Sequence, residues 1–395
     1  MLEIQHAYSE NSRAMRVLLT ILALTSLSFT LWFTNHISED ATNGTRPYDF
    51  VKYYITSWNL RTDVSIYSPL ATSEELETKI GWSHQDGSRA ADPPTLALVT
   101  YPLSFLSYTQ AWWLVASISC ISLISSIYFT MRHYEHSIRR SLEISLIPLS
   151  CFPMLVMLIL NHIESLLLPL GVAGWLLLKR SHPLASLFWS SAIALKLFPG
   201  MWLIGLAGAR HRQQTISVLI FTSVLILTSV LIIGPDNIKV FLLEVIPQSK
   251  DWVFSLGNVS IKSFLAILLP TSLSNILYLL VFIGVSGFVL LKARSPDRIY
   301  TLGASSSLIL SPLSWSYYFV IMIPPLIILA HHLNLKERKQ RYHLVFSIFA
   351  LLYFPSQLGG FLPENHMNNV GYILFNFIPC IALGHYTYLA NKYIS

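Results

Sequence analysis

Long apolar runs, separated by short clusters of charged residues, dominate this sequence. Runs of this kind predict membrane-spanning helices, because lipid leaves every backbone polar group to be satisfied within the protein. Only 12% of the residues are charged, roughly half the share found in ordinary soluble domains. This composition excludes a disordered chain and argues against a soluble enzyme. We therefore predict an all-α polytopic membrane protein with about 10–12 transmembrane helices.

The first apolar run, 17–33, is long enough to span a bilayer. The pattern of small residues that marks a signal-peptide cleavage site does not follow it, so we expect a membrane anchor. Several of the later runs are short, which is typical of broken or re-entrant helices. They lie near residues 112–131, 142–160, 163–178, 184–195, 197–209, 216–233, 273–291, 300–313, 317–330, 343–355 and 371–390.

The basic residues indicate how the chain is oriented. Most of them fall in clusters that share one side of the membrane if the predicted spans alternate, and that side is then the cytoplasm. Both termini are expected on the same side. The net charge of +6 therefore reflects orientation, and no nucleic-acid partner is implied. The clusters are Arg13 and Arg16; Arg132, Arg139 and Arg140; Lys179 and Arg180; Arg210 and Arg212; Lys292, Arg294 and Arg298; and Lys336, Arg338, Lys339 and Arg341.

Two long segments fall on the opposite, outer face. They cover residues 35–94 and 234–272, and the first is rich in acidic residues. Long loops in compact domains usually carry function. We expect a single membrane domain over residues 1–395, with these two segments as its outer loops.

Asp49 is the first candidate functional residue. It lies close to Tyr53 and Tyr54, shortly after the first predicted span. Tyrosines are expected at the membrane interface, but an acid among them is less expected. A carboxylate in an apolar cleft can act as a general base on a hydroxyl. Composition alone favours the alternative of a solvated loop acid.

Lys196 is the second candidate, because it is the one charged residue in the apolar stretch 194–199. A lysine at membrane depth is costly and often functional, and the anion of a lipid phosphate would suit it. The alternative is a lysine that extends its ammonium group to the interface.

Further polar and aromatic residues fall on the same predicted face. His162 and Glu164 lie in a tight turn between apolar runs, where polar residues are needed in any case. Trp315, Tyr317 and Tyr318 follow another run, where they could line the interface or stack on a sugar face. The shared placement predicts a reaction at the outer leaflet between a lipid-borne group and an acceptor.

The three cysteines, Cys120, Cys151 and Cys380, each lie inside an apolar run. Their positions suggest neither a disulfide framework nor a metal site, and we expect small buried side chains. No metal or other cofactor is expected.

Several of these motifs occur together in one known family. Asp49 is followed by tyrosines, the pair Pro93-Pro94 opens the second membrane segment, residues 194–199 fit Ala-Leu-Lys-x-x-Pro, residues 257–260 fit Gly-Asn-x-Ser, and residues 311–315 fit Ser-Pro-x-Ser-Trp. On these motifs the sequence resembles glycosyltransferase family 87, of the glycosyltransferase C superfamily. The resemblance runs from about Met15 to His332. The superfamily implies a multi-helix membrane bundle.

The sequence departs from the family pattern in three places, one of which is a longer loop from Asp63 to Asp92. After Ser-Pro-x-Ser-Trp the family often has an acid and then a histidine, whereas here Ser316, Tyr317 and Tyr318 follow. The Gly-Gln-x-Asn turn of the family corresponds to Asn161-His162-Ile163-Glu164. These departures leave the sugar and the acceptor open.

The resemblance implies an inverting hexosyltransferase of glycolipid biosynthesis, with mannose as the expected sugar and a polyprenyl phosphate as its carrier. The acceptor would be a lipid or a glycan. Asp49 would be the general base and Lys196 would bind the donor phosphate. The remaining candidates would bind sugar or acceptor: Tyr53, Tyr54, His162, Glu164, Asn258, Trp315, Tyr317 and Tyr318.

The expected location is the cytoplasmic (inner) membrane of the cell, with the active site on the periplasmic or extracellular side. One alternative is a transporter or flippase for a lipid or polyol, which would spread polar residues through the depth of the bundle. Another is a non-catalytic membrane subunit, which would tolerate loss of Asp49.

Overall fold

The structure is a computed structural model. It describes residues 12–42, 49–71, 73–80, 85–86, 89–134, 136–248, 250–254, 258–353 and 377–395. Gly257 of the Gly-Asn-x-Ser motif, part of the predicted outer loop 35–94 and parts of the predicted spans 343–355 and 371–390 lie outside these residues.

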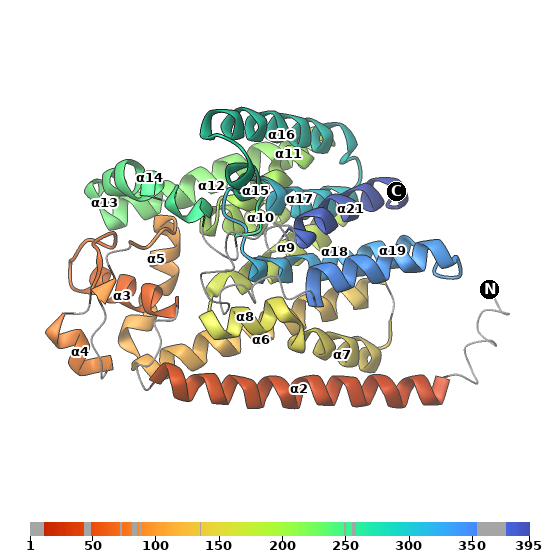
Figure 1. Cartoon of the computed structure of the whole chain (residues 1–395), viewed down its shortest axis with the longest axis horizontal. Coiled ribbons are helices and arrows are strands. Elements are labelled where there is room, and N and C mark those ends of the chain that lie inside the picture. The colour runs from red at the N-terminus through yellow and green to blue at the C-terminus, as the bar shows by residue number, and fades with distance from the viewer. Residues whose placement is uncertain are drawn as a thin grey trace.

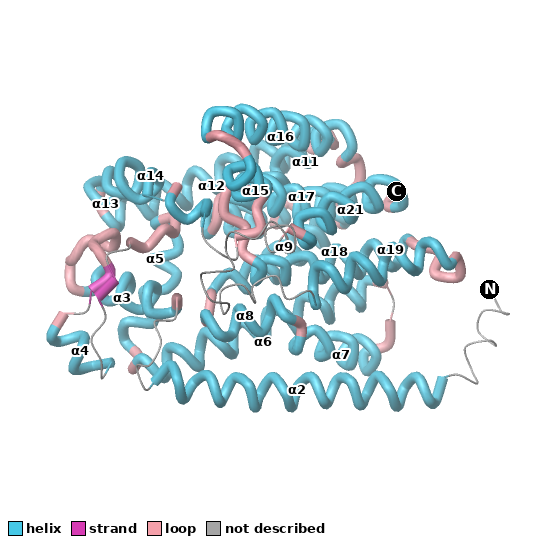
Figure 2. The backbone as a smooth tube through the Cα atoms, viewed as in Figure 1, coloured by secondary structure: helices cyan, strands magenta, loops and turns pink. Residues whose placement is uncertain are grey.

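The described chain is almost entirely helical, with one short antiparallel pair of strands (Figure 2). The label η marks a short 3₁₀ helix or, for η5 and η8, a π-helix. The first half contains α2 (Ser12–Thr42), α3 (Phe50–Arg61), β1 (Leu70–Ala71), α4 (Glu74–Ile80), β2 (Gln85–Asp86), α5 (Pro94–Thr100), η1 (Tyr101–Phe105), α6 (Tyr108–His133), α7 (Ile138–Leu146), η2 (Ile147–Ser150), α8 (Phe152–Leu160), η3 (Ile163–Leu166), α9 (Leu167–Lys179) and α10 (Ala185–Leu195).

The second half continues the same architecture. It contains η4 (Phe198–Gly200), α11 (Met201–Gly208), α12 (Arg212–Ile233), α13 (Pro235–Val240), η5 (Phe241–Val245), α14 (Ile246–Gln248), η6 (Asp251–Phe254), α15 (Ile261–Leu268), α16 (Thr271–Lys292), α17 (Pro296–Leu310), η7 (Ser316–Met322), α18 (Ile323–His332), α19 (Arg338–Ile348), η8 (Phe349–Tyr353) and α21 (Ile378–Tyr393).

The local sequence explains where two of these helices begin and end. α6 starts after Ser107, whose hydroxyl accepts the N–H of Gln110 while the Gln110 side chain accepts the N–H of Ser107, forming a capping box. α10 ends at Leu195 because Pro199 has no N–H and its ring would clash with the carbonyl four residues before it. The break leaves Lys196 in an extended conformation.

Among the described residues, three helices are long and apolar enough to cross a membrane: α6, α12 and α16. They coincide with the predicted spans 112–131, 216–233 and 273–291. The stretch from α7 to η2 together with α8, which is bent by 65°, would count as a fourth span. The first predicted span, 17–33, lies within α2. The larger number of about 10–12 spans stays a prediction.

Small residues allow the central helices to pack closely. A Cβ atom at Gly174 of α9 would lie only 2.2 Å from the Trp189 ring of α10, and the Trp189 indole donates a hydrogen bond to the carbonyl of Gly171. Gly303 of α17 admits the Trp202 ring of α11 in the same way. This use of glycine is typical of helix interfaces in membranes, and it builds the scaffold that carries the candidate site.

The bundle has two distinct ends (Figure 1). α3, α4, α13 and α14 gather at one end, on the left of the figure, which we call the cap end. The α6–α7 junction, the α18–α19 loop and the C-terminus lie at the other end. We call it the basic end, because it carries Arg139 and Arg140 of α7 and Arg338 and Lys339 of α19.

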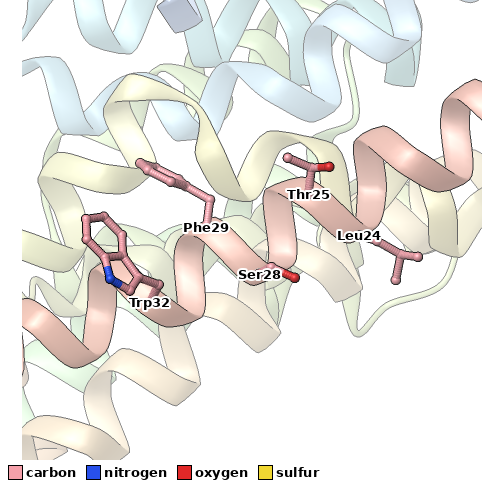
Figure 3. A pocket seen from close by; sticks show the side chains of 5 residues that line it. All are labelled: Leu24, Thr25, Ser28, Phe29 and Trp32. Carbon is pink, nitrogen blue, oxygen red and sulfur yellow. The ribbon is translucent and has the colours of Figure 1, made fainter.

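The outer flanks of the bundle expose large apolar side chains. Figure 3 shows Leu24, Thr25, Ser28, Phe29 and Trp32 along α2, and Trp32 is 61% exposed. Exposed apolar residues recur along α12 and α16. Contiguous apolar surface of this extent is typical of contact with a membrane.

The two predicted outer loops contact one another at the cap end. Ser65 donates a hydrogen bond to Asn237 Oδ1 at 2.6 Å, and Arg89 forms an ion pair with Glu244 at 2.9 Å. These two contacts join residues that are about 150 or more positions apart in the sequence. The loops form one cap beside the charged residues described next.

Candidate active site

A line of charged side chains of alternating sign runs along the start of α3 and the turn after α8. Lys52 Nζ lies 2.6 Å from Asp49 Oδ1, and Asp49 Oδ2 lies 2.9 Å from His162 Nε2. His162 Nδ1 in turn lies 2.7 Å from Glu164 Oε2. The imidazole therefore joins two carboxylates that are far apart in sequence.

Lys196 continues this line in the opposite direction. Its ammonium lies 2.9 Å from Glu164 Oε1 and 2.5 Å from Asp92 Oδ1. The two principal sequence candidates, Asp49 and Lys196, are thus connected through two intermediate side chains. We call the six residues the charged chain: Lys52, Asp49, His162, Glu164, Lys196 and Asp92.

Breaks in helical structure place four members of the charged chain. Asn161 ends α8 in the left-handed conformation (φ 51°), and its side-chain amide donates to the carbonyl of Trp112 at 2.8 Å. Asparagine adopts this conformation more readily than most residues. The turn projects His162 and Glu164 toward α3. Asp92 precedes the proline that caps α5, and Lys196 sits at the break after α10.

The charged chain is largely buried. Glu164 is 2% exposed and His162 is 8% exposed, whereas Asp49 keeps 27% of its side chain accessible. A buried charge is tolerated when it is paired and hydrogen-bonded, and the alternation of sign supplies such a pair at every step. Of the two carboxylates, Asp49 is the one that a second molecule can reach more readily.

The neighbouring charges determine the ionisation states of Asp49, His162 and Glu164. Burial alone would lower the pKa of His162, but the carboxylates of Glu164 and Asp49 outweigh it and raise that pKa to about 9. Burial tends to raise the pKa of Asp49, yet His162 and Lys52 hold it well below its usual range. Burial also tends to raise the pKa of Glu164, while His162 and Lys196 depress it. Both acids are therefore carboxylates at neutral pH.

Aromatic rings enclose the charged chain. The Tyr53 hydroxyl donates to both oxygens of Glu164 at 3.2 Å and lies 2.6 Å from His162 Nδ1. The Tyr317 ring stacks on the His162 ring with centroids 4.3 Å apart. Lys196 Nζ lies 5.8 Å from the centre of the Tyr318 ring, within the range of a cation–π contact.

A cavity of about 650 Å³ opens beside Lys196. Most of the side chains around it are apolar, and they come mainly from η4, α11, η5, α16, the end of α17 and the residues that follow it. Cavities of this size and character are typical of ligand sites, where a few polar groups fix the orientation of the ligand. Its lining includes Lys196, Phe198, Phe241, Phe282, Leu310 and Tyr318.

Other predicted site residues lie in structural positions. Tyr54 donates to the carbonyl of Leu106 and packs edge-on against Tyr108. Asn258 donates to the carbonyl of Pro312 and accepts the N–H of Ser314, and its backbone bridges to Trp315. These contacts join the Gly-Asn-x-Ser segment to the Ser-Pro-x-Ser-Trp segment. Tyr54 and Asn258 therefore join neighbouring segments of the scaffold and are not members of the charged chain.

Asp92 and Lys52 belong to the charged chain although neither is among the site residues predicted from the sequence. Asp92 had a usable signal, since an acid directly before Pro93-Pro94 is held at the start of a helix. Lys52 follows Asp49 by three residues, a spacing that brings side chains together on a helix. The Asp92 signal did not identify its partner, because Lys196 is more than a hundred positions away in the sequence.

Within the part of the chain that the structure describes, no group of three or more His, Cys, Asp or Glu side chains is arranged to hold a metal ion. The carboxylates of the charged chain are instead paired with His162, Lys52 and Lys196.

Comparison with known proteins gave one match. The model of glycosyltransferase family 87 matches residues 92–324, which is more than half of the chain. This region contains α5 to α17, the turn with His162 and Glu164, and both Asp92 and Lys196. Asp49 precedes it. Searches of curated proteins and of solved structures gave no significant match.

Proposed function

Because the chain belongs to glycosyltransferase family 87, we propose that it transfers a sugar from a polyprenyl-phosphate donor to a lipid or glycan acceptor at the cap end. The resemblance found in the sequence suggests mannose as the sugar. The charge pattern of the sequence suggests that the cap end faces the outer side of the membrane.

One observation supports a lipid-linked donor above all others. Lys196 lies where the charged chain meets the apolar cavity, so a single ligand could place a phosphate on the ammonium and a hydrocarbon tail in the cavity. Ammonium groups bind phosphate through charge-assisted hydrogen bonds. Burial of the apolar tail would contribute most of the binding free energy.

The proposed reaction is direct transfer with inversion. Asp49 accepts the proton of the acceptor hydroxyl while the oxygen attacks the anomeric carbon opposite the phosphate. The bond from that carbon to the phosphate oxygen breaks, and its electron pair leaves with the lipid phosphate. Lys196 stabilises the negative charge that develops there.

Asp92 competes with the donor in this proposal. It already contacts the Lys196 ammonium at 2.5 Å. An incoming phosphate must therefore displace that carboxylate or share the ammonium with it. Glu164 remains paired with His162 when this happens. The resting ion pair therefore neutralises Lys196 until a donor arrives.

Replacing the proposed base tests this mechanism. Membranes from cells that express the full chain are supplied with polyprenyl-phosphate mannose, and transfer to acceptor is measured. Asp49→Asn should lower turnover by about 10²–10⁴-fold, since it removes general base catalysis. Undiminished transfer would exclude Asp49 as the base.

Asp63→Asn is the matched control. Asp63 is an exposed acid close to the end of α3, and its left-handed φ of 56° suits asparagine equally well. We expect this variant to retain the activity of the unmodified protein. A loss equal to that of Asp49→Asn would mean that the assay reports general damage at the cap end.

The identity of the sugar is tested separately. Glycolipids and surface glycans are compared by mass spectrometry with and without the gene. Loss of one hexose or pentose from a defined species would name both the sugar and the acceptor. Unchanged glycan masses with an altered distribution of a lipid would favour a lipid transporter instead.

A further inference from the structure

We propose that His162 is the positioning residue of this site: its imidazolium bridges Asp49 and Glu164 and so fixes the base carboxylate relative to Lys196. The inference rests on the proposed function, in which Asp49 is the base. It assigns to His162 a task other than the sugar or acceptor contact that the sequence suggested.

The hydrogen-bond geometry favours the charged form of His162. Nε2 faces Asp49 at 2.9 Å and Nδ1 faces Glu164 at 2.7 Å. A neutral imidazole has one N–H and one lone pair, so it could donate to only one of two carboxylates. The other carboxylate would then face a lone pair inside the protein, which is costly. The imidazolium donates to both.

The imidazole ring is held on several sides, so its orientation is fixed. Tyr317 stacks on one face at 4.3 Å, and the Tyr53 ring meets it edge-on with centroids 5.7 Å apart. The backbone carbonyl of His162 accepts the hydroxyl of Ser119 from α6 at 3.3 Å. A ring locked in this way places Asp49 within the narrow range that catalysis requires.

The bridge also determines which oxygen of Asp49 can react. Oδ2 is occupied by the buried imidazolium, while Oδ1 contacts Lys52, whose side chain is 34% exposed. Lys52 is the more accessible of the two partners of Asp49, so an acceptor can displace its ammonium more readily than the buried imidazolium. Oδ1 is therefore the oxygen that an acceptor hydroxyl can approach.

The charged and titratable groups that face His162 define the expected effect of pH. They are Asp49 and Tyr53 from the start of α3, Glu164 from the same turn and Tyr317 from η7, with Lys196 beyond Glu164. The raised pKa of His162, about 9, means that the imidazolium is fully present below the ordinary value of 6.5 and is lost as pH rises through about 9. Turnover should decline over the same range.

The first experiment compares the rate and its pH profile in His162→Gln and in the unmodified full chain, using the membrane assay described above. We expect His162→Gln to lower kcat by about 10²-fold, because the base is misplaced, with a smaller change in the KM for polyprenyl-phosphate mannose. Its remaining activity should show no decline near pH 9. A rate within twofold of the unmodified chain, or the same alkaline decline, would overturn the inference.

The second experiment needs no substrate. The full chain, labelled with ¹⁵N-histidine and held in detergent micelles, is titrated by nuclear magnetic resonance, and His162 is assigned by its absence in His162→Gln. We expect both ring nitrogens to be protonated at pH 7, and Asp49→Asn to lower the midpoint of the titration. A neutral imidazole at pH 7 would overturn the inference even if transfer of the chosen sugar were undetectable.

The two proposals fail in different ways. If Asp49→Asn retains full turnover, the proposed function is wrong. If Asp49→Asn abolishes turnover while His162→Gln keeps both the rate and the pH profile, only the role of His162 is wrong.

Discussion

Lys196 is held by two carboxylates, so a change at this single residue acts on folding as well as on donor use. Glu164 is almost fully buried and Asp92 is only partly accessible. Removing the ammonium leaves Glu164 with one cationic neighbour in place of two. The sequence suggested a lysine alone in an apolar stretch, and the structure adds its two partners.

Lys196→Met is therefore expected to lower the free energy of unfolding by about 3–5 kcal/mol, the usual cost of removing one partner of a buried ion pair. Donor use should also be lost. Thermal unfolding of the detergent-solubilised chain measures the first effect, and transfer from polyprenyl-phosphate mannose measures the second.

The double variant Lys196→Met/Glu164→Gln separates these two effects. It removes one of the two carboxylates that lose the Lys196 ammonium, so it should regain part of the lost stability while donor use stays absent. Recovery of transfer together with stability would contradict a role for Lys196 in binding the donor phosphate.

At the scale of helices, the close approach of α11 to α16 depends on a residue without a side chain. A Cβ atom at Gly208 would lie 2.1 Å from the carbonyl oxygen of Leu290, which is backbone and cannot rotate aside. Gly284, on the same α16, has open space where its Cβ would be. A side chain at Gly208 would therefore push α11 and α16 apart, whereas a side chain at Gly284 would not.

Gly208→Ala should destabilise the protein by about 1–3 kcal/mol, as overpacking does elsewhere. Gly284→Ala should have little effect or stabilise slightly, because alanine favours helix over glycine. Unfolding temperatures of the two variants in detergent check this contrast. Equal losses for both would contradict the packing described here.

The spans predicted at 216–233 and 273–291 match α12 and α16 closely, because a continuous apolar run determines a long membrane helix locally. The 65° bend before α8 was not predicted, and neither was the contact between Ser65 and Asn237. Both depend on segments that meet only in three dimensions. The links from His162 to Asp49 and from Lys196 to Asp92 were missed for the same reason.

At the scale of the whole molecule, the two ends differ in charge and in shape. The basic end gathers the arginines and lysines around α7 and the start of α19, while the cap end carries both outer loops (Figure 1). The charge pattern predicts that the basic end faces the cytoplasm. That orientation is what makes the proposed reaction an outer-leaflet reaction.

Cysteine labelling tests the orientation. Glu75 of α4 and Arg180 after α9 are both exposed, at opposite predicted sides. With a membrane-impermeant maleimide, Glu75→Cys should be labelled in intact cells and Arg180→Cys only after permeabilisation. The unmodified chain, whose cysteines are buried or partly buried, gives the background. The reverse pattern would place the charged chain on the cytoplasmic side.

The contact between Asp92 and Lys196 bears on how each catalytic cycle would close. In the proposed reaction the departing lipid carries a phosphate monoester, which is more negative than the diester that entered, so the ammonium would hold the spent carrier more tightly than the fresh one. A resident carboxylate at 2.5 Å offers a replacement partner as the carrier moves off. Release of the carrier, and hence the pace of repeated turnover, would then depend on an acid that takes no part in making the glycosidic bond.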